Sequence, residues 1–395
     1  MRKIAFFVLL SAFVVALSAQ TSSFAEYQTD HYRVLSEMGQ DHARETALRL
    51  EALMEVFNRY YHFDPDELPV RLRARFFSSK DRYDSYLRRV IDTTRDDFVY
   101  LHYTDLAKSE LVGYGMDDDA FDLSLKHQGF VQFLRAFIPN PPLWLREGFA
   151  VYFEEVEFDD QLETATYREN LAWLETLQSI MDGTAGIAPI PLSEMLRMNV
   201  EQARARIEVF YPQAWGMVSF LLNSDERRYN RIIWDSISAL QTDASLAENS
   251  ASVWHRAFRW HPEEELVESF VEYVGSRRSF RMLVEEGIDL YTEGELAAAR
   301  EAFLEAVALR EDSFVPYYYL GLISYDEKDH STADRYYREA LARGAAPALT
   351  YYALGVNAYA DNRFDDAEGY LEQTVSLDPS EYEDKATRLL ERIRG

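Results

Sequence analysis

The sequence predicts an α+β domain followed by an all-α array of helical repeats. Two observations carry this prediction. In stretches of the first 115 residues hydrophobic and polar side chains alternate, as in half-buried strands, whereas from about residue 116 the hydrophobic residues recur with helical spacing. Towards the C-terminus the same residue types return every 34 positions, which indicates a repeat architecture. At 395 residues the chain is also too long for one ordinary domain.

The composition excludes several classes of partner. The chain holds 68 acidic and 41 basic residues, a formal net charge of −27, and it has no long basic run. Because nucleic acids and anionic membranes are bound by clustered Lys and Arg, we expect neither as a partner. With 47% hydrophobic residues the chain can bury sizeable cores, so it is not a disordered acidic protein. The expected partner is a protein or peptide.

The N-terminal residues have the pattern of an export signal. Two basic residues precede an apolar run from Ile4 to Leu17, and small residues follow it. The run is shorter than the roughly 20 residues that a membrane-spanning helix needs. We therefore expect a signal peptide over residues 1–19, an exported protein that is periplasmic or otherwise extracytoplasmic, and no stable membrane insertion after signal removal. An uncleaved anchor is the alternative.

Strand-like and helix-like stretches follow one another after this signal. Residues 26–35, 68–77 and 98–103 alternate as strands do, and residues 41–61 have helical spacing. From about residue 119 to residue 275 the pattern is wholly helical. These stretches predict a small N-terminal sheet followed by a helical part.

Residues 124–155 are the most informative part of this region. His127 lies on one predicted helix, and Pro141 with Pro142 begins a second helix, on which apolar residues surround Glu147 at three and four positions' distance. A carboxylate that points into an apolar face is costly to bury unless it is paired. We therefore expect Glu147 to have a partner, and His127 is the candidate.

This stretch resembles the gluzincin zinc metallopeptidases, in particular the peptidase MA-like domains of exported bacterial proteins. That family carries His-Glu-x-x-His on one helix and Trp-Leu-x-Glu-Gly on the next, and the second motif stands here at residues 144–148. The resemblance covers residues 25–279. It implies a thermolysin-like fold, with a mixed α+β part over residues 25–115 and a helical part over residues 116–279.

The first motif departs from the family pattern at the general-base position and at the second metal-ligand position. His127 keeps the first ligand position, but Gln128 replaces the general base and Val131 replaces the second histidine ligand. A catalytic zinc needs three protein ligands and a base that takes the proton of its bound water. The resemblance therefore implies a catalytically inactive domain with no cofactor, in which His127 and Glu147 are remnant ligands. Tyr211 matches a region where such peptidases place a helper tyrosine, although an aromatic residue near a helix start is more often part of the core.

Two other interpretations of this site stay open. In the first, His127 and Glu147 form a plain interior pair that keeps two helices in register. In the second, the chain is an active zinc metallopeptidase with atypical ligands. Zinc enters only in this second alternative.

Residues of the C-terminal part recur in columns at the 34-residue period. The columns include Gly287, Gly321 and Gly355; Tyr291, Tyr325 and Tyr359; and Ala299, Ala333 and Ala367. This pattern resembles the tetratricopeptide repeat (TPR), whose unit is two antiparallel helices with small residues where they touch. The resemblance implies three repeats over residues 280–379 and a capping helix over residues 380–395.

The geometry of that family implies a concave groove lined by the first helix of each repeat. The tyrosines facing it would be Tyr291, Tyr318, Tyr325, Tyr352 and Tyr359, and the aliphatic residues would be Val284, Ile288, Leu322 and Val356. Such a surface suits an extended or helical peptide with apolar side chains, and it lacks the basic residues that clamp a C-terminal carboxylate. The alternative is that several of these tyrosines only pack between helices.

The sequence thus predicts an exported, catalytically inactive peptidase-like protein. It would act as a protein-binding or peptide-binding scaffold of the cell envelope through its repeat groove, with the old substrate cleft as a second candidate surface. In a further alternative the repeats do all the binding and the first domain is only structural.

Overall fold

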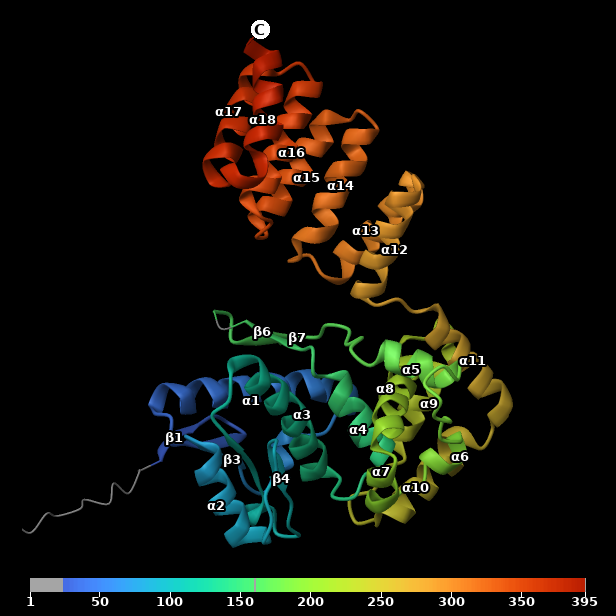
Figure 1. Cartoon of the computed structure of the whole chain (residues 1–395). Helices are drawn as coiled ribbons and strands as arrows, with labels where there is room; N and C mark the ends of the chain where they lie inside the picture. The colour runs from blue at the N-terminus through green and yellow to red at the C-terminus, as the bar shows by residue number, and fades with distance from the viewer. Residues whose placement is uncertain (1–23, 160, 395) are drawn as a thin grey trace, which may run out of the picture. The chain divides into compact units, whose positions relative to one another are not determined.

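The computed structural model describes residues 24–159 and 161–394 and divides into two compact units (Figure 1). The first unit holds the chain up to Asn170 together with Ile190–Glu263, and the second holds Leu171–Pro189 together with the chain from Glu264 onward. The signal peptide expected over residues 1–19 lies outside the described residues. The domain boundaries expected from the sequence stay predictions.

The first unit combines two sheets with helices. Its strands are β1 (Ala25–Gln28), β2 (Tyr32–Ser36), β3 (Leu72–Phe77), β4 (Val99–Leu101), β5 (Glu110–Tyr114), β6 (Glu157–Asp159) and β7 (Thr164–Thr166). Its α-helices are α1 (Gln40–Tyr61), α2 (Lys80–Ile91), α3 (Asp118–Phe137), α4 (Leu143–Tyr152), α6 (Leu192–Met195), α7 (Val200–Ala205), α8 (Ile207–Asn223), α9 (Arg227–Ser238) and α10 (Leu246–Val253). Two 3₁₀ helices, η1 (Pro65–Glu67) and η2 (Leu106–Lys108), and a π-helix, η3 (Trp254–Phe258), complete it.

The larger sheet has five strands in the order β1-β2-β3-β5-β4. The inner pairs β2–β3 and β3–β5 are parallel, and the two outer pairs are antiparallel. Along β3 the residues Leu72, Ala74 and Phe76 are buried, while Arg73 and Arg75 alternate with them on the opposite face. The small N-terminal sheet predicted from the sequence is therefore present.

Three details of the expected strands are wrong. Residues 26–35 form two strands, because the chain turns where the N–H of Thr29 donates to the carbonyl oxygen of Tyr32 at 3.0 Å. Strand β3 starts only at Leu72, since η1 precedes it. The hairpin β6–β7 interrupts the stretch that was expected to be wholly helical. Its strands have three residues each, too few for an alternating pattern to stand out.

An aromatic core joins α1, α3 and α4. The ring centroid of Phe57 lies 5.3 Å from that of Phe130 and 4.9 Å from that of Phe153, and Phe130 lies 5.9 Å from Phe149. All four side chains are fully buried. Because buried aromatic pairs add about 0.5–1.5 kcal/mol each beyond their area, this cluster fixes α3 against α4.

Every regular secondary-structure element among the described residues of the second unit is an α-helix. Its helices are α5 (Leu174–Met181), α11 (Glu263–Ser276), α12 (Phe280–Glu293), α13 (Leu296–Leu309), α14 (Phe314–Asp326), α15 (His330–Ala342), α16 (Pro347–Ala360), α17 (Phe364–Leu377) and α18 (Pro379–Arg394). Helix α5 joins this unit through Gln178, whose amide donates to the carbonyl oxygens of Val274 and Arg277 at 2.9 Å.

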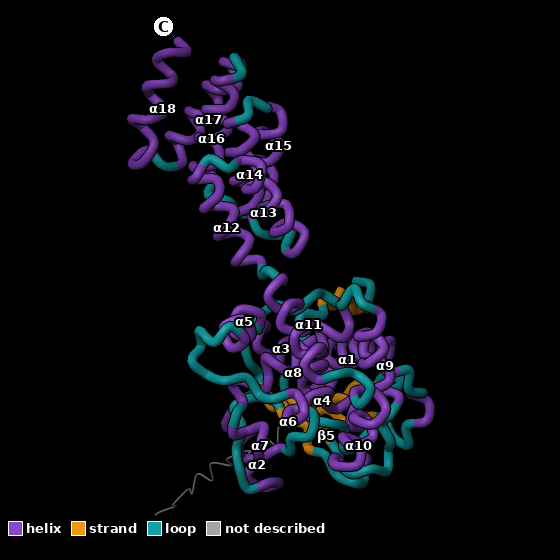
Figure 2. The backbone as a smooth tube through the Cα atoms, turned by 90° about the vertical axis from the view of Figure 1, so that its right-hand side faces the viewer, coloured by secondary structure: helices purple, strands orange, loops and turns teal. Residues whose placement is uncertain are grey.

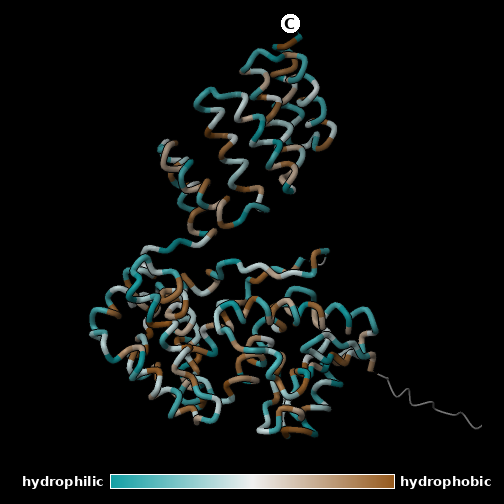
Figure 3. Tube along the Cα trace, turned by 180° about the vertical axis from the view of Figure 1, so that it is seen from behind, coloured by the Kyte–Doolittle hydropathy of each residue, from teal (hydrophilic) through white to brown (hydrophobic). Residues whose placement is uncertain are grey.

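The predicted helix-pair repeats are confirmed by the pairs α12–α13, α14–α15 and α16–α17 (Figure 2). In each pair, the glycine that recurs every 34 residues on the first helix faces a large side chain of the second helix, namely Phe303, Tyr337 or Leu371. A Cβ atom at Gly321 would overlap the ring of Tyr337, and one at Gly287 would overlap the ring of Phe303. Only glycine allows this close approach, which explains the period that the sequence shows. Along these helices hydrophobic and hydrophilic positions alternate (Figure 3).

Helix α18 covers the end of the repeat array. Its Ala386 and Leu390 pack on Leu371 of α17, and Tyr382 lies 5.2 Å from the ring of Tyr352. In the part of the chain that the structure describes, no helix combines the length and the apolar character that crossing a membrane requires.

Candidate functional site

The most concentrated polar site of the first unit lies where α3, α4 and α8 meet. Helix α3 begins at Asp117, whose carboxylate accepts from the N–H of Ala120 at 3.0 Å, and it ends just before Pro139. Helices α4 and α8 cross at Gly148, where any side chain would overlap the carbonyl oxygen of Ala214. The glycine after Glu147 therefore lets α8 approach the site closely.

His127 is held between two carboxylates. Its Nε2 atom lies 3.4 Å from Oε2 of Glu147, and its Nδ1 atom lies 2.8 Å from Oε1 of Glu154. The side chains of His127 and Glu154 are each 13% exposed and that of Glu147 is 9% exposed. The structure thus brings together the two residues that the sequence singled out, and it adds Glu154.

Glu147 has two further partners. The Nε atom of its neighbour Arg146 donates to Oε1 at 2.7 Å, and the hydroxyl group of Tyr211 on α8 donates to Oε2 at 3.2 Å. The ring of Tyr211 also stacks on His127, with 6.2 Å between the ring centroids. Tyr211 is therefore part of the cluster and not only a core residue.

The charges of this cluster are mutually stabilising. Burial alone would lower the pKa of His127, but its hydrogen bonds to Glu147 and Glu154 raise that pKa to about 9. Burial would raise the pKa of Glu147, but the charge of Arg146 and the hydrogen bond with His127 lower it to about 2. At neutral pH His127 is thus a cation and Glu147 an anion.

The residues around His127 do not fit a catalytic zinc. Val131, one turn further along α3, is 7% exposed and has no lone pair to donate. A metal ion would have to displace the proton of His127, and Glu147 is engaged by Arg146 and Tyr211. Within residues 24–159 and 161–394, no three His, Cys, Asp or Glu side chains are placed to hold an ion together.

Sequence reasoning missed two members of the cluster, although a signal was present. Glu154 follows Glu147 by seven residues, which corresponds to two helical turns, and in the structure it lies in the turn directly after α4 ends at Tyr152. Arg146 is adjacent to Glu147, and residues that are neighbours in a helix do not normally face each other. The long guanidinium side chain turns back to reach it, and no spacing rule predicts that.

The nine residues expected in the repeat groove share one property. All of them are partly exposed, whereas the neighbouring residues of the same helices, among them Leu283, Leu320 and Leu354, are buried. We call this surface the tyrosine face: Val284, Ile288, Tyr291, Tyr318, Leu322, Tyr325, Tyr352, Val356 and Tyr359.

The tyrosines of this face also make contacts within the array. The hydroxyl group of Tyr291 donates to Asp326 at 2.9 Å, and the ring of Tyr318 lies 5.7 Å from that of Tyr337. Tyr325 lies 6.0 Å from His330. These tyrosine side chains thus pack between helices and are also partly exposed on the surface.

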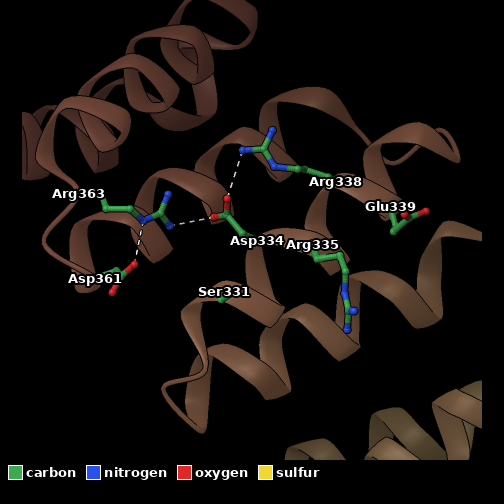
Figure 4. A pocket seen from close by; sticks show the side chains of 7 residues that line it. All are labelled: Ser331, Asp334, Arg335, Arg338, Glu339, Asp361 and Arg363. Carbon is green, nitrogen blue, oxygen red and sulfur yellow. Dashed lines mark hydrogen bonds and ion pairs between the residues drawn. The ribbon is translucent and has the colours of Figure 1, made fainter.

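A shallow hollow of about 460 Å³ opens beside α15 and the start of α17 (Figure 4). It is lined by Ser331, Asp334, Arg335, Arg338, Glu339, Asp361 and Arg363. Asp334 bridges Arg338 at 3.2 Å and Arg363 at 3.0 Å, and Arg363 also binds Asp361 at 2.8 Å. Three carboxylates thus balance three guanidinium groups, so the hollow has no net charge that would select a ligand.

No known family model matches the sequence, and no curated protein is similar to it. Several solved structures are similar to part of the chain. The first TPR domain of Spaghetti (RPAP3), bound to the HSP90 peptide SRMEEVD, is 19% identical over 29% of this chain and 90% of that chain, with a TM-score of 0.27. The TPR domain of Arabidopsis OM64 is 16% identical over 29% and 93%, with a TM-score of 0.28. MamA of Desulfovibrio magneticus RS-1 is 20% identical over 36% and 90%, with a TM-score of 0.26. These likenesses add nothing to the helix-pair geometry already described.

Proposed function

We propose that this protein is a non-catalytic binding protein that holds an extended segment of a partner protein on its tyrosine face. The observation that carries the proposal is the recurrence of partly exposed tyrosine and aliphatic side chains at equivalent positions of α12, α14 and α16. Partly exposed rings that stand in a row on rigid helices offer a large contact area at little conformational cost.

The hydroxyl groups of this face add polar recognition. Among the described residues, those of Tyr318, Tyr325, Tyr352 and Tyr359 have no hydrogen-bond partner, so they can bond the backbone of a bound peptide. None of the nine positions is basic, which removes the usual means of holding a C-terminal carboxylate. We therefore expect recognition of an internal segment of the partner.

The first unit enters the proposal as a peptidase-like domain without peptidase activity. Metal-binding histidines commonly donate one ring N–H to a carboxylate while the other nitrogen faces the metal. His127 has the same two-sided arrangement, with Nδ1 on Glu154 and Nε2 towards Glu147. Gln128 and Val131 supply neither base nor ligand, which supports a binding or structural role for this unit.

A peptide-display selection on the purified protein tests the binding function. We expect selected peptides to be rich in aromatic and aliphatic residues, and to bind equally well with an amidated C-terminus. The variant Tyr325→Ala/Tyr359→Ala should weaken a selected peptide roughly tenfold by fluorescence polarisation. Tyr336→Ala serves as the matched control, because Tyr336 is a partly exposed tyrosine on the second helix of a repeat. If the selection yields no binder, or if both variants bind alike, the proposal is wrong.

The absence of peptidase activity needs a separate test. Calorimetric titration with zinc and a quenched fluorescent peptide library together address the alternative of an active enzyme. Tight stoichiometric zinc binding with chelator-sensitive cleavage would establish the metallopeptidase and rule out the inactive domain.

We also propose that the protein is exported to an extracytoplasmic compartment. The support is the apolar run from Ile4 to Leu17 behind two basic residues. Mass spectrometry of the mature N-terminus, together with cell fractionation, tests this. An intact N-terminus on cytoplasmic protein would refute it.

A further inference from the structure

One part of this acidic chain is strongly basic. Between Arg71 and Arg95 the sequence holds eight basic and three acidic residues, although the chain as a whole carries −27. This segment covers β3 and α2, whose positions in the first unit are seen in Figure 1. This segment therefore has a net positive charge, whereas the chain as a whole has a net negative charge.

The arginines lie on the face of the sheet that α2 partly covers. Arg73 and Arg75 project from β3 on the side opposite to Leu72, Ala74 and Phe76, a side that they share with the buried Phe77, and Arg71 directly precedes the strand. From α2, Tyr86 reaches over this face. The guanidinium carbon of Arg75 lies 5.5 Å from the ring centroid of Tyr86, and that of Arg89 lies 5.4 Å from it. We name Arg71, Arg73, Arg75 and Arg89 the arginine face.

A single carboxylate accompanies these four guanidinium groups. Glu110 on β5 is 4% exposed and accepts from Arg73 at 3.2 Å and from Arg75 at 3.1 Å. In the described part of the chain, Arg71 and Arg89 have no carboxylate partner, and Arg71 donates instead to the carbonyl oxygen of Thr29 at 2.7 Å. The arginine face therefore keeps a positive excess beside β3, the central strand of the sheet.

This arrangement is chemically suited to carboxylates. Guanidinium groups bind carboxylates through two parallel hydrogen bonds, and rings such as that of Tyr86 hold the guanidinium planes in position. Arg71 and Arg89 are exposed, so their donors are accessible. They are not needed to neutralise the buried charge of Glu110, because Arg73 and Arg75 already pair with it.

We propose that the arginine face docks an acidic segment of a partner protein, rich in Asp and Glu. Charge complementarity favours a short segment over a membrane or a nucleic acid. Those two present extended anionic surfaces, against which the strongly negative remainder of this chain would be repelled. A short segment meets only the local charge, since salt screens charges beyond about 8 Å. This site is independent of the tyrosine face and of its proposed function.

A labelled octaglutamate peptide is the probe, and octaglutamine is its uncharged control. In fluorescence polarisation at low salt, we expect octaglutamate to bind the purified protein and octaglutamine not to bind. Arg71→Gln/Arg89→Gln should weaken binding roughly tenfold, because it removes two charged donors while it leaves the pairs of Glu110 intact. Arg71→Lys/Arg89→Lys, which keeps the charge, should retain more of the affinity than the glutamine variant does.

The matched control is Arg231→Gln/Arg256→Gln, which makes the same change in net charge. Both residues are exposed and lie on α9 and η3 of the same unit. The control should bind octaglutamate as the unchanged protein does, and circular dichroism should show that all variants are folded.

Three results would overturn the proposal. The first is equal affinity of Arg71→Gln/Arg89→Gln and the control. The second is binding to phosphatidylserine vesicles without binding to octaglutamate, which would identify a membrane surface. The third is salt-sensitive self-association in sedimentation velocity that the glutamine variant abolishes while octaglutamate does not bind, which would identify a second copy of the chain as the occupant.

Discussion

The Nε2 atom of His127 lies 3.4 Å from Oε2 of Glu147, and this contact joins α3 to α4 inside the first unit. The sequence resemblance to gluzincins assigns these two residues to the first and last ligand positions, and that assignment stays a prediction. They pair directly with each other, and Glu154 and Arg146 balance the outer sides of the pair. The charges of this pair are therefore already satisfied within the cluster.

Restoring the two missing residues should restore zinc binding. The change Gln128→Glu/Val131→His places a second imidazole one turn after His127 and a base beside it, which completes the family motif. We expect one zinc per chain by calorimetry, with an affinity at least about a hundredfold above that of the unchanged protein, since three ligands replace two.

The single change Gln128→Glu is the control for this gain. The restored carboxylate is a base and not a ligand, so it should leave zinc affinity nearly unchanged, whereas Val131→His alone should account for most of the gain. If the double variant binds zinc no better than the unchanged protein, α3 and α4 do not have the spacing of a ligand set.

The His127 cluster should make the stability of the first unit depend on alkaline pH. The pKa of His127 is raised to about 9, so the stability that its charge confers is fully present below its unfolded value of 6.5 and is lost as the pH rises through 9. The lowered pKa of Glu147 keeps that carboxylate charged over this range, and burial raises the pKa of Tyr211 so that its hydroxyl stays protonated. We expect a loss on the order of 2–3 kcal/mol between neutral pH and pH 10.

His127→Gln tests this pH dependence. The variant should be less stable than the unchanged protein at pH 7 and should lose much less stability on the way to pH 10. Urea unfolding at several pH values, followed by hydrogen exchange of peptides from α3 and α4, measures both. Parallel pH profiles of the two proteins would show that another group titrates.

The repeat array could be predicted in detail because the same contact between two helices recurs in each repeat and requires the same type of residue each time. Gly321 must be glycine to admit Tyr337, and the same pair recurs as Gly287 with Phe303, so the sequence shows the contact at a fixed period. The first unit gives a weaker signal. Strand β5 is buried along most of its length and therefore does not alternate, so nothing in its sequence distinguishes it from other apolar stretches.

The candidate site was predictable only in part. His127 and Glu147 could be paired because a carboxylate in an apolar face needs a partner. The short β6–β7 hairpin and the position of α8 could not be derived, since both depend on tertiary contacts. Tyr211 reaches Glu147 because Gly148 lets α8 approach, and Tyr211 and Glu147 are 64 positions apart in the chain.

A substitution at Gly148 tests whether this glycine is required for the close contact between α4 and α8. Gly148→Ala places a methyl group against the carbonyl oxygen of Ala214, a backbone atom that cannot move independently. We expect a loss of about 1–3 kcal/mol in the stability of the first unit and a weaker contact between Tyr211 and Glu147. Gly275→Ala on α11, where the added methyl group meets nothing within 4 Å, should not destabilise the protein.

The helix pairs of the array allow the same comparison within one unit. Gly321→Ala forces a methyl group into the ring of Tyr337 and should destabilise α14 and α15 by about 1–3 kcal/mol. Gly369→Ala on α17 meets nothing within 4 Å, and it should stabilise its helix by up to about 1 kcal/mol because alanine is the better helix former. Because the chain has two units, a single melting temperature would mix their transitions, so hydrogen exchange of peptides from α14, α15 and α17 is the appropriate measurement. Equal protection in the two variants would mean that Tyr337 moves aside, and that the 34-residue period of glycine does not arise from this contact.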